Sequence, residues 1–487
     1  MTVVVIFLLA APLLVALAAL RAPARVSQVL TVAVGVLAFA GVLFLVPAAA
    51  RHDATVWRYL RVDAISVVFL LATSFLYAVV GAYSIGYLRA DEDAEDFGAY
   101  ARRFYVGVNL FAWSMLAAPL MSSLALLWIA IEVTTVISAL LVAIEDTDGA
   151  VEAAWKYVLI ASAGLGIALL ATIFAYYAGA QVLGQSYDLT FASLAGAGSR
   201  LPHTAVQLAF VLAVVGYGTK VGLFPVHTWL PDAHAEAPTP VSALLSGSLL
   251  AVSFYAILRF YQVAVATLGP RFPQTVLLVF GVASLLLAAL YLLDQRDIKR
   301  LLAYSSVEHM GILAIGVSFG APLAFAGVLL HVLAHAAAKA NAFMGAGVLV
   351  RKYGTKTISK IGGGLDALPW TGPLLLMGIF ALCAMPPFGI FRSEFQIVAG
   401  GLGSSRNTGT AILVVLVTVA FLGLSVAANR ILFTPSGDGA VVRGEPSAWM
   451  VAPMVVGIGA LLLLGVHPPG DLADLLTRGV AELRGVG

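Results

Sequence analysis

The stretch that decides the fold is "VVGYGTKVGLFPVHTWLPDAHAEAPTP", residues 214–240. An apolar run carries one lysine, Lys220, and then breaks at Pro225 into a segment rich in histidine, acids and further prolines. Burying an unpaired ammonium group in an apolar environment is very costly. Lys220 therefore needs a carboxylate partner or a function, and the surrounding sequence shows what kind of environment buries it.

The composition is that of a membrane protein. The 487 residues are 61% hydrophobic and 11% charged, whereas soluble domains carry about 25% charged residues. We therefore expect an all-α polytopic protein whose residues 1–487 form a single integral membrane domain. A net charge of +2 does not indicate a nucleic-acid partner. The single cysteine, Cys383, excludes a disulfide framework and a cysteine-ligated iron–sulfur cluster. We expect no cofactor or metal here, so any redox chemistry belongs to another polypeptide.

The apolar segments predict about fourteen membrane-spanning helices, since a helix needs about 20 apolar residues to cross a hydrocarbon core of about 30 Å. The expected spans lie near residues 2–20, 28–48, 63–88, 104–120, 122–144, 152–180, 204–224, 240–264, 273–293, 297–318, 320–350, 372–400, 409–432 and 448–466. The first lacks a basic leader region, so we expect it to be retained. An amphipathic tail, residues 470–485, is expected at the membrane interface.

Lysine and arginine are more frequent in the loops that follow odd-numbered spans. Loops rich in lysine and arginine face the cytoplasm in most membrane proteins. The sequence therefore predicts an inner (plasma) membrane protein with both termini outside.

Ionisable residues inside the expected spans are few and are distributed along the chain. They include Lys156, Lys220, Lys339, Arg392, Glu132, Glu308, Glu394, His309, His331 and His335. Such residues are costly within a membrane and usually line ion pathways or proton relays. Their distribution favours a hydrophilic axis through the protein over one local site.

Two expected spans are interrupted by proline. The first, "GYGTKVGLFPVHTWLPDAH", carries Lys220, and the second, "ALCAMPPFGIFRSEF", carries Glu394. Transporters often place their sites on such discontinuous helices, at matching positions of two inverted halves. The two segments lie five spans apart, and this odd offset would invert one half relative to the other. The alternative is a pair of proline kinks that serve packing alone.

These segments resemble a known family. "KVGLFPVHTWLPDAHAEAPTPVSALL", "LLWIAIEVTTVIS", "DQRDIKRLLAYSSVEHMGILAIG" and "HVLAHAAAKANAFMGAG" are similar to the antiporter-like membrane subunits of respiratory complex I, Mrp cation/proton antiporters and group-4 hydrogenases. The resemblance extends from about Asp63 to Glu394. Within it, "YSSVEHMGI" and "PPFGIFRSEF" are most similar to the hydrogenase-4 F-type subunit.

The resemblance implies two inverted five-helix repeats, at residues 104–264 and 273–432, each forming half of a proton channel. Residues 1–103 would hold the first three spans, and residues 448–487 the last span and the tail. By position, Glu132 is the partner of Lys220, and Lys339 and Glu394 belong to the second half. Many relatives carry a histidine or lysine in the span near 240–264, whereas this chain has neither there. Candidates for the missing link are His234 and, with water, Ser242, Ser246 and Ser248.

Physical chemistry gives Lys220 a role without reference to the family. Desolvation weakens the hold of an amine on its proton, and a nearby carboxylate restores it. At about 5 Å and an effective dielectric constant of about 20, one charge contributes about 3 kcal/mol. Glu132 could therefore control when Lys220 binds and releases a proton. An arginine could not replace Lys220 in this role, because arginine stays charged. The alternative is a static buried ion pair that fixes helix packing.

The second half contains a spaced group of basic residues. His331, His335 and Lys339 recur every four residues and share one helix face. We interpret them as a hydrated relay; the alternative, metal ligation by the two histidines, lacks a clear third ligand. Glu308 and His309 are adjacent, so they point about 100° apart, and we favour Glu308 as the residue that faces the axis.

Three further residues have open roles. His227 and His234, in the broken segment, are candidates for proton access or for a plain interface. Lys156 lies one helical turn after Glu152. It is a candidate inlet residue, or a side chain that extends to the membrane surface.

The function that fits these features is a proton-translocating membrane subunit of a multi-subunit redox-driven complex, of hydrogenase, formate-hydrogenlyase or complex I type. Its partners would be other membrane subunits and a peripheral redox module. The alternatives are a cation/proton antiporter subunit of Mrp type, the membrane subunit of an inorganic-carbon uptake complex, or a structural scaffold. A scaffold is disfavoured because it has no need for four costly buried groups, and the pattern fits Na⁺ as well as H⁺.

Overall fold

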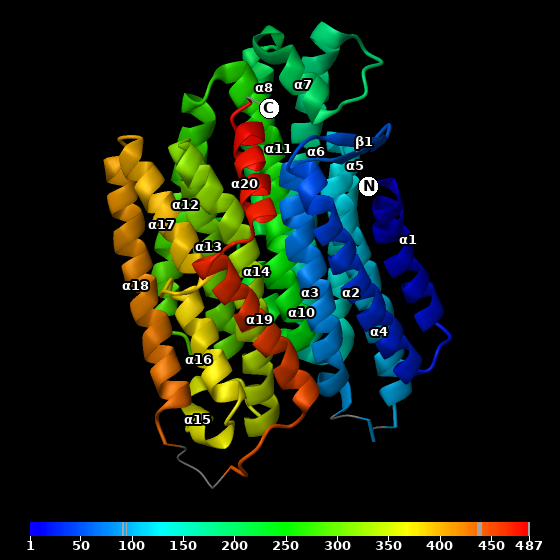
Figure 1. Cartoon of the computed structure of the whole chain (residues 1–487), viewed down its shortest axis with the longest axis vertical. Helices are drawn as coiled ribbons and strands as arrows, with labels where there is room; N and C mark the ends of the chain where they lie inside the picture. Colours follow the sequence, from blue (N-terminus) through cyan, green and yellow to red (C-terminus); the bar gives the residue numbers. More distant parts are fainter. Residues whose placement is uncertain (90–91, 94, 436–440, 486–487) are drawn as a thin grey trace.

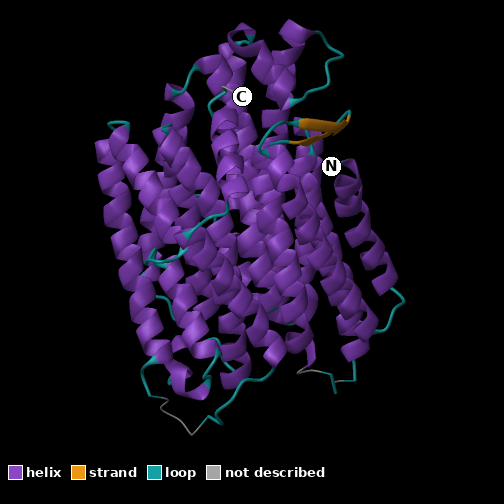
Figure 2. Cartoon of the chain, viewed as in Figure 1, coloured by secondary structure: helices purple, strands orange, loops and turns teal. Residues whose placement is uncertain are grey.

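The computed structural model describes residues 1–487 except 90–91, 94, 436–440 and 486–487. The described chain is helical apart from one hairpin, which the sequence analysis did not anticipate (Figure 2). Its strands β1 (Ala54–Trp57) and β2 (Leu60–Val62) pair antiparallel. The long helices form one bundle, and both termini lie at the same end of it (Figure 1).

Twelve helices among the described residues are long and apolar enough to cross a membrane. They are α1 (Thr2–Ala19), α2 (Ala24–Ala49), α3 (Ala64–Arg89), α5 (Leu124–Val142), α6 (Asp148–Leu183), α8 (His203–Val221), α10 (Thr239–Leu244) continued by α11 (Leu250–Leu268), α12 (Arg271–Leu292), α13 (Ile298–Phe319), α14 (Pro322–Tyr353), α18 (Asn407–Leu432) and α19 (Ala448–Val466). The chain is therefore a multi-pass membrane protein.

The other two expected spans do not meet the same criteria. The segment near 104–120 lies in α4 (Phe97–Ala117), which is long enough but less apolar than the twelve. The segment near 372–400 forms two shorter helices, α16 (Thr371–Leu382) and α17 (Gly389–Gly403). Four more short helices are present: α7 (Phe191–Ala197), α9 (Trp229–Glu236), α15 (Gly364–Ala367) and α20 (Gly470–Leu483).

The helix interruptions occur where the prolines predict them. Helix α8 ends at Val221 and α9 begins at Trp229, while α16 ends at Leu382 and α17 begins at Gly389. Each gap includes a cis peptide bond, at Phe224–Pro225 and at Pro386–Pro387. A third irregularity joins α10 to α11 without a break, as a π-helical turn over Leu245–Leu249.

The core of the bundle consists of the helices that carry polar residues. Helices α3, α10–α11, α13 and α14 are buried over 100%, 100%, 94% and 89% of their most apolar stretch, whereas α1 and α18 are buried over 33%. Side chains on the central helices therefore meet protein in every direction. This burial is what makes ionisable groups on α13 and α14 interact with one another and not with lipid.

The amphipathic tail forms α20, and its apolar face is covered by protein and not by the membrane interface alone. Leu475 and Leu483 are buried, and the carboxylate of Glu482 accepts hydrogen bonds from the backbone N–H groups of Ala64 (2.9 Å) and Ile65 (3.1 Å). This carboxylate thereby caps the first turn of α3, where four N–H groups lack intrahelical partners.

Candidate functional site

Lys220 lies in the last turn of α8 and is fully buried. Its ammonium group donates a hydrogen bond to the hydroxyl of Tyr157 on α6, at 2.5 Å, and lies 4.9 Å from the centre of the same ring. The Tyr157 hydroxyl also lies 2.7 Å from Ser138 Oγ on α5. The lysine is thus held by a neutral acceptor that belongs to a short hydrogen-bonded chain.

Close packing of α6 against α8 makes this contact possible. A Cβ atom on Gly216, one turn before Lys220, would overlap the backbone of Ala168. Small residues are a common means for membrane helices to approach closely. The glycine therefore brings the end of α8 within hydrogen-bonding reach of Tyr157.

Glu132 on α5 interacts electrostatically with Lys220, as the sequence position predicts. Among the described residues, however, the two form no ion pair within 4.0 Å, and Glu132 Oε2 is buried without a hydrogen-bond partner. The two groups therefore interact without forming an ion pair in the described chain.

Lys339 on α14 repeats this arrangement in the second half. It is fully buried, and its ammonium group donates to the backbone carbonyl of Leu302 at 2.9 Å. Glu308 on α13 interacts with it electrostatically, and Glu308 Oε2 is buried without a partner in the described chain. Each half thus holds a lysine bonded to a neutral oxygen and an acid with one unsatisfied oxygen.

A cluster of three buried histidines lies next to this pair. His309 Nδ1 is 3.1 Å from His331 Nε2, and His331 Nδ1 is 2.9 Å from Ser393 Oγ on α17. The Ser393 hydroxyl donates to the Ile390 carbonyl at 2.8 Å, so it accepts from His331 Nδ1–H. His331 Nε2 is then the acceptor of a proton donated by His309.

His335 completes the cluster, with its ring 5.1 Å from that of His309 and 6.2 Å from that of His331. Both of its ring nitrogens are buried without a partner in the described part of the chain. A glycine again sets the helix spacing, because a Cβ atom on Gly327, one turn before His331, would overlap the Ser393 carbonyl. Helix α14 can therefore present its histidines directly to α17.

Glu394 on α17 contacts this cluster rather than Lys339. Its Oε1 lies 3.9 Å from His309 Nδ1, which makes His309 a contact partner that the sequence analysis did not assign. Potential ligand atoms of His309, His331 and Glu394 lie within 4.8 Å of one another. The hydrogen bond between the two histidines uses nitrogens that an ion would need, so we interpret the group as a hydrogen-bonded relay.

The two histidines of the broken segment form no hydrogen bond with Lys220 or Lys339 among the described residues, although His234 interacts electrostatically with Lys339. His234 on α9 is fully buried, stacks on Phe343 of α14 with ring centres 5.4 Å apart, and has two unpaired ring nitrogens within the described chain. His227 lies between α8 and α9, and its ring is 6.5 Å from that of Tyr304. His234 therefore faces the second half, whereas His227 lies beside α13.

Lys156 lies at the surface, with 48% of its side chain exposed. It forms ion pairs with Glu152 at 2.7 Å and with Asp232 at 3.2 Å. Arg300 also contacts Asp232, at 2.7 Å. The structure does not bring Lys156 together with the buried groups, and its place is on the outside of the first half.

One of the three candidate serines contacts a serine of α13. Ser246 Oγ, in the π-helical turn, lies 2.7 Å from Ser306 Oγ on α13. Ser248 instead bonds to Thr73, and Ser242 donates to the His234 carbonyl. Single π turns are frequent at functional sites. This one brings Ser246 to Ser306, which lies two residues before Glu308 on α13.

Comparisons with known proteins show the family and the fold to which this chain is similar. The family model described as NADH:quinone oxidoreductase/Mrp antiporter, TM, matches residues 121–422. A hydrogenase-4 component F homolog of Methylacidiphilum infernorum is 34% identical over 454 residues, covering 92% of this chain and 93% of the relative. Hydrogenase-4 component B of Escherichia coli is 33% identical over 366 residues, covering 72% and 52%. A chain of respiratory complex I from Thermus thermophilus has the same fold, with a TM-score of 0.83, 23% identity and coverage of 99% and 100%.

Proposed function

Because the chain belongs to the NADH:quinone oxidoreductase/Mrp antiporter family of membrane subunits, we propose that it is the proton-translocating membrane subunit of a multi-subunit complex. Similarity to two hydrogenase-4 components supports a redox-driven complex of hydrogenase type. Structural neighbours that are chains of multi-subunit membrane complexes support other membrane subunits as partners. A peripheral redox module would supply the energy.

One observation carries the proposal. Both buried lysines bond to neutral oxygens, while Glu132 and Glu308, the acids that influence them, each keep one oxygen without a partner. A static ion pair would place the opposite charges in contact, because only close contact and further hydrogen bonds offset the cost of desolvation. Separated groups can instead gain and lose protons in turn, which is what translocation requires.

The driving step is electrostatic. Protonation of Glu132 removes a negative charge that acts on Lys220. For any two charges about 5 Å apart at an effective dielectric constant of about 20, such a change is worth about 3 kcal/mol. That is a factor on the order of one hundred in proton affinity. Glu308 acts on Lys339 in the same way, so each acid switches its lysine between holding and releasing a proton.

A route between the halves passes through the serine contact. From Lys220 a proton reaches Ser246 through water, crosses to Ser306 over 2.7 Å and arrives at Glu308 and Lys339. It continues through His335, His309 and His331 to Glu394. Glu394 lies five residues after Gly389, where α17 begins beyond the second helix break. His234, which faces α14, is the side entry to this route, and His227 and Lys156 lie toward its first-half inlet.

The proposal includes the complete topology. Helix α4 and the α16–α17 pair bring the number of spans to fourteen, in two inverted repeats at residues 104–264 and 273–432, with both termini outside. Two facts support it. The lysine–acid arrangement occurs once in each half, and the two termini lie at the same end of the molecule (Figure 1).

The test is proton uptake by inverted membrane vesicles that contain the whole complex with Glu394→Gln. Glutamine keeps the shape and hydrogen bonding but cannot titrate, so uptake should fall at least tenfold while the subunit remains in the complex. Glu394→Asp, the matched control, should retain part of the activity. Full uptake by Glu394→Gln would contradict the proposed exit, and uptake that requires added Na⁺ would favour the antiporter.

A further inference from the structure

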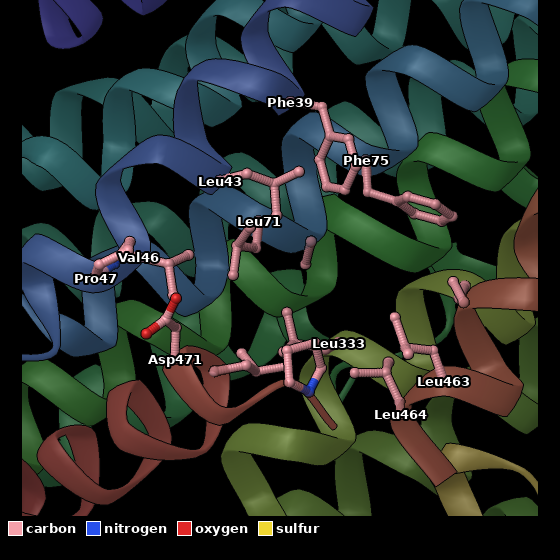
Figure 3. A pocket seen from close by; sticks show the side chains of 15 residues that line it. Phe39, Leu43, Val46, Pro47, Leu71, Phe75, Leu333, Leu463, Leu464 and Asp471 are labelled. Carbon is pink, nitrogen blue, oxygen red and sulfur yellow. The ribbon is translucent and has the colours of Figure 1, made fainter. Parts of the chain in front are cut away.

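A crevice of about 250 Å³ opens between α2, α3, α14, α19 and the start of α20 (Figure 3). Its walls are apolar side chains, including Leu43 and Val46 of α2, Leu333 of α14 and Leu463 of α19. Asp471 is the one charged residue that lines it, and its carboxylate lies beside Val46 and Pro47 (Figure 3). The crevice is separate from the buried lysines and histidines described above.

The crevice begins at the end of a membrane span and is closed further in. Along α2 its lining runs from Pro47, two residues before the helix ends at Ala49, back to Phe39. Eight residues of helix correspond to about 12 Å, or more than a third of a hydrocarbon core of about 30 Å. At the inner end the rings of Phe39 and Phe75 pack edge to face, with centres 5.6 Å apart.

The outer end continues into a polar cavity of about 360 Å³, which shares Pro47 and Asp471 with the crevice and adds Arg51, Asp474 and Arg478. The Arg51, Asp471 and Asp474 side chains are exposed, and none has an ion-pair partner in the described chain. Arg478 donates to Asp53 at 3.0 Å. One free cation and two free carboxylates therefore face the same cavity, directly above an apolar crevice.

We propose that this site binds one phospholipid with a zwitterionic phosphoethanolamine head group. One acyl chain fills the apolar crevice, the phosphate pairs with the guanidinium of Arg51, and the ammonium group donates to Asp471 and Asp474. Guanidinium groups bind phosphate oxygens in a bidentate manner, and a primary ammonium offers three donors to carboxylates.

The shape of the site favours a lipid chain over a helix of a partner subunit. A transmembrane helix needs a groove along about 30 Å of membrane, whereas the lining of this crevice extends along only about two helical turns of α2, from Pro47 to Phe39. The charges also favour a zwitterion. An anionic head group would meet the two carboxylates, and like charges at close range repel.

The experiment is native mass spectrometry of the whole complex, first with its co-purified lipids and then after delipidation and titration with phosphatidylethanolamine or phosphatidylglycerol. Ala460→Phe fills the crevice from α19, where Ala460 is a lining residue, and Val456→Phe on the same helix is the control outside it. The first variant should lose one bound phosphatidylethanolamine per complex, and the second should lose none.

The head-group contacts have their own variants. Arg51→Gln should weaken binding of phosphatidylethanolamine about tenfold, as expected for one charge-assisted hydrogen-bonding group. Arg58→Gln, an exposed arginine outside the cavity, should leave binding unchanged. Replacing Asp471 and Asp474 together by Asn should abolish the preference for phosphatidylethanolamine over phosphatidylglycerol.

Three results would overturn the proposal. These are equal lipid retention by Ala460→Phe and Val456→Phe, phosphatidylglycerol binding as tight as that of phosphatidylethanolamine in the unmodified protein, and insensitivity of binding to Arg51→Gln. A photo-crosslinking residue at position 460 that labels a protein subunit in place of a lipid would also overturn it.

Discussion

The ammonium group of Lys220 donates a hydrogen bond to the hydroxyl of Tyr157 at 2.5 Å, while Glu132 makes no ion pair with it within 4.0 Å in the described chain. The lysine therefore has a neutral partner that stays in place whichever protonation state Glu132 adopts. The Ser138 hydroxyl donates to the Thr134 carbonyl, so the Tyr157 hydroxyl donates to Ser138 and accepts from the lysine. In the proposed pathway, Tyr157 is therefore the residue that positions Lys220.

Tyr157→Phe should lower proton uptake about tenfold, because a hydrogen bond to a charged group is worth about 1.5–3 kcal/mol. Uptake by inverted vesicles, normalised to the amount of assembled subunit, measures the effect. Tyr217→Phe is the matched control, since Tyr217 is a buried tyrosine on the same helix as Lys220 and its hydroxyl bonds to no ionisable side chain among the described residues. Equal uptake by both variants would remove Tyr157 from the pathway.

His309→Gln should reduce uptake at least tenfold, because glutamine can bond to His331 or Glu394 but cannot take up and pass on a proton. His467→Gln, an exposed histidine directly after α19, is the control and should be neutral. Steady uptake across a pH series in His309→Gln would mean that Glu308 delivers protons to the exit without the histidine cluster.

The two lysine–acid pairs and the shared helix face of His331 and His335 were partly predictable from sequence, whereas the contact of His309 with these histidines was not. Lys220 and the break at Pro225 are local signals, because a charge in an apolar run and a proline within it are visible without a fold. Tyr157 and Ser393 are common residue types whose importance arises only when α6 meets α8 and α14 meets α17. Helix spacing predicts neither contact.

The interpretation of Glu308 and His309 shows the same limit of local reasoning. Adjacent residues point about 100° apart, so one of them was expected to face the axis. Helix α13 is surrounded by protein, however, and both directions lead to polar partners: Glu308 interacts with Lys339 and His309 with His331. The hairpin at residues 54–62 was missed because its short strands lack an extended alternating pattern.

The docking of α20 should depend on pH through Glu482. Burial and the nearby Asp63 carboxylate raise the pKa of Glu482 to about 7, although Arg259 and the two N–H groups of α3 favour its charged form. Arg259, which bonds to Asp63 at 2.6 Å, holds the pKa of Asp63 below its usual value in spite of burial. Of the two acids, Glu482 is therefore the one that titrates near neutral pH.

A carboxyl group whose pKa is higher in the folded state than in the unfolded state stabilises the fold when protonated, and this contribution is lost as the pH rises through the folded pKa. Thermal stability of the purified protein should therefore fall between about pH 4.5, the ordinary pKa of a glutamate, and about pH 7. Glu482→Gln cannot titrate, so the difference in melting temperature, variant minus unmodified protein, should become more positive over this interval. A difference that is constant, or that becomes more negative, would contradict the assignment.

The most direct test of the central claim is proton uptake by complexes that carry Lys220→Arg, compared with Lys220→Met and the unmodified protein. Arginine keeps a positive charge next to Tyr157 and Glu132 but does not release its proton, so a structural ion pair would survive the change and a proton carrier would not. We expect both variants to assemble and both to lose translocation, with Lys220→Arg no better than about a tenth of the normal rate. Translocation by Lys220→Arg at the normal rate would contradict the account and identify Lys220 as a fixed charge that holds the helices together.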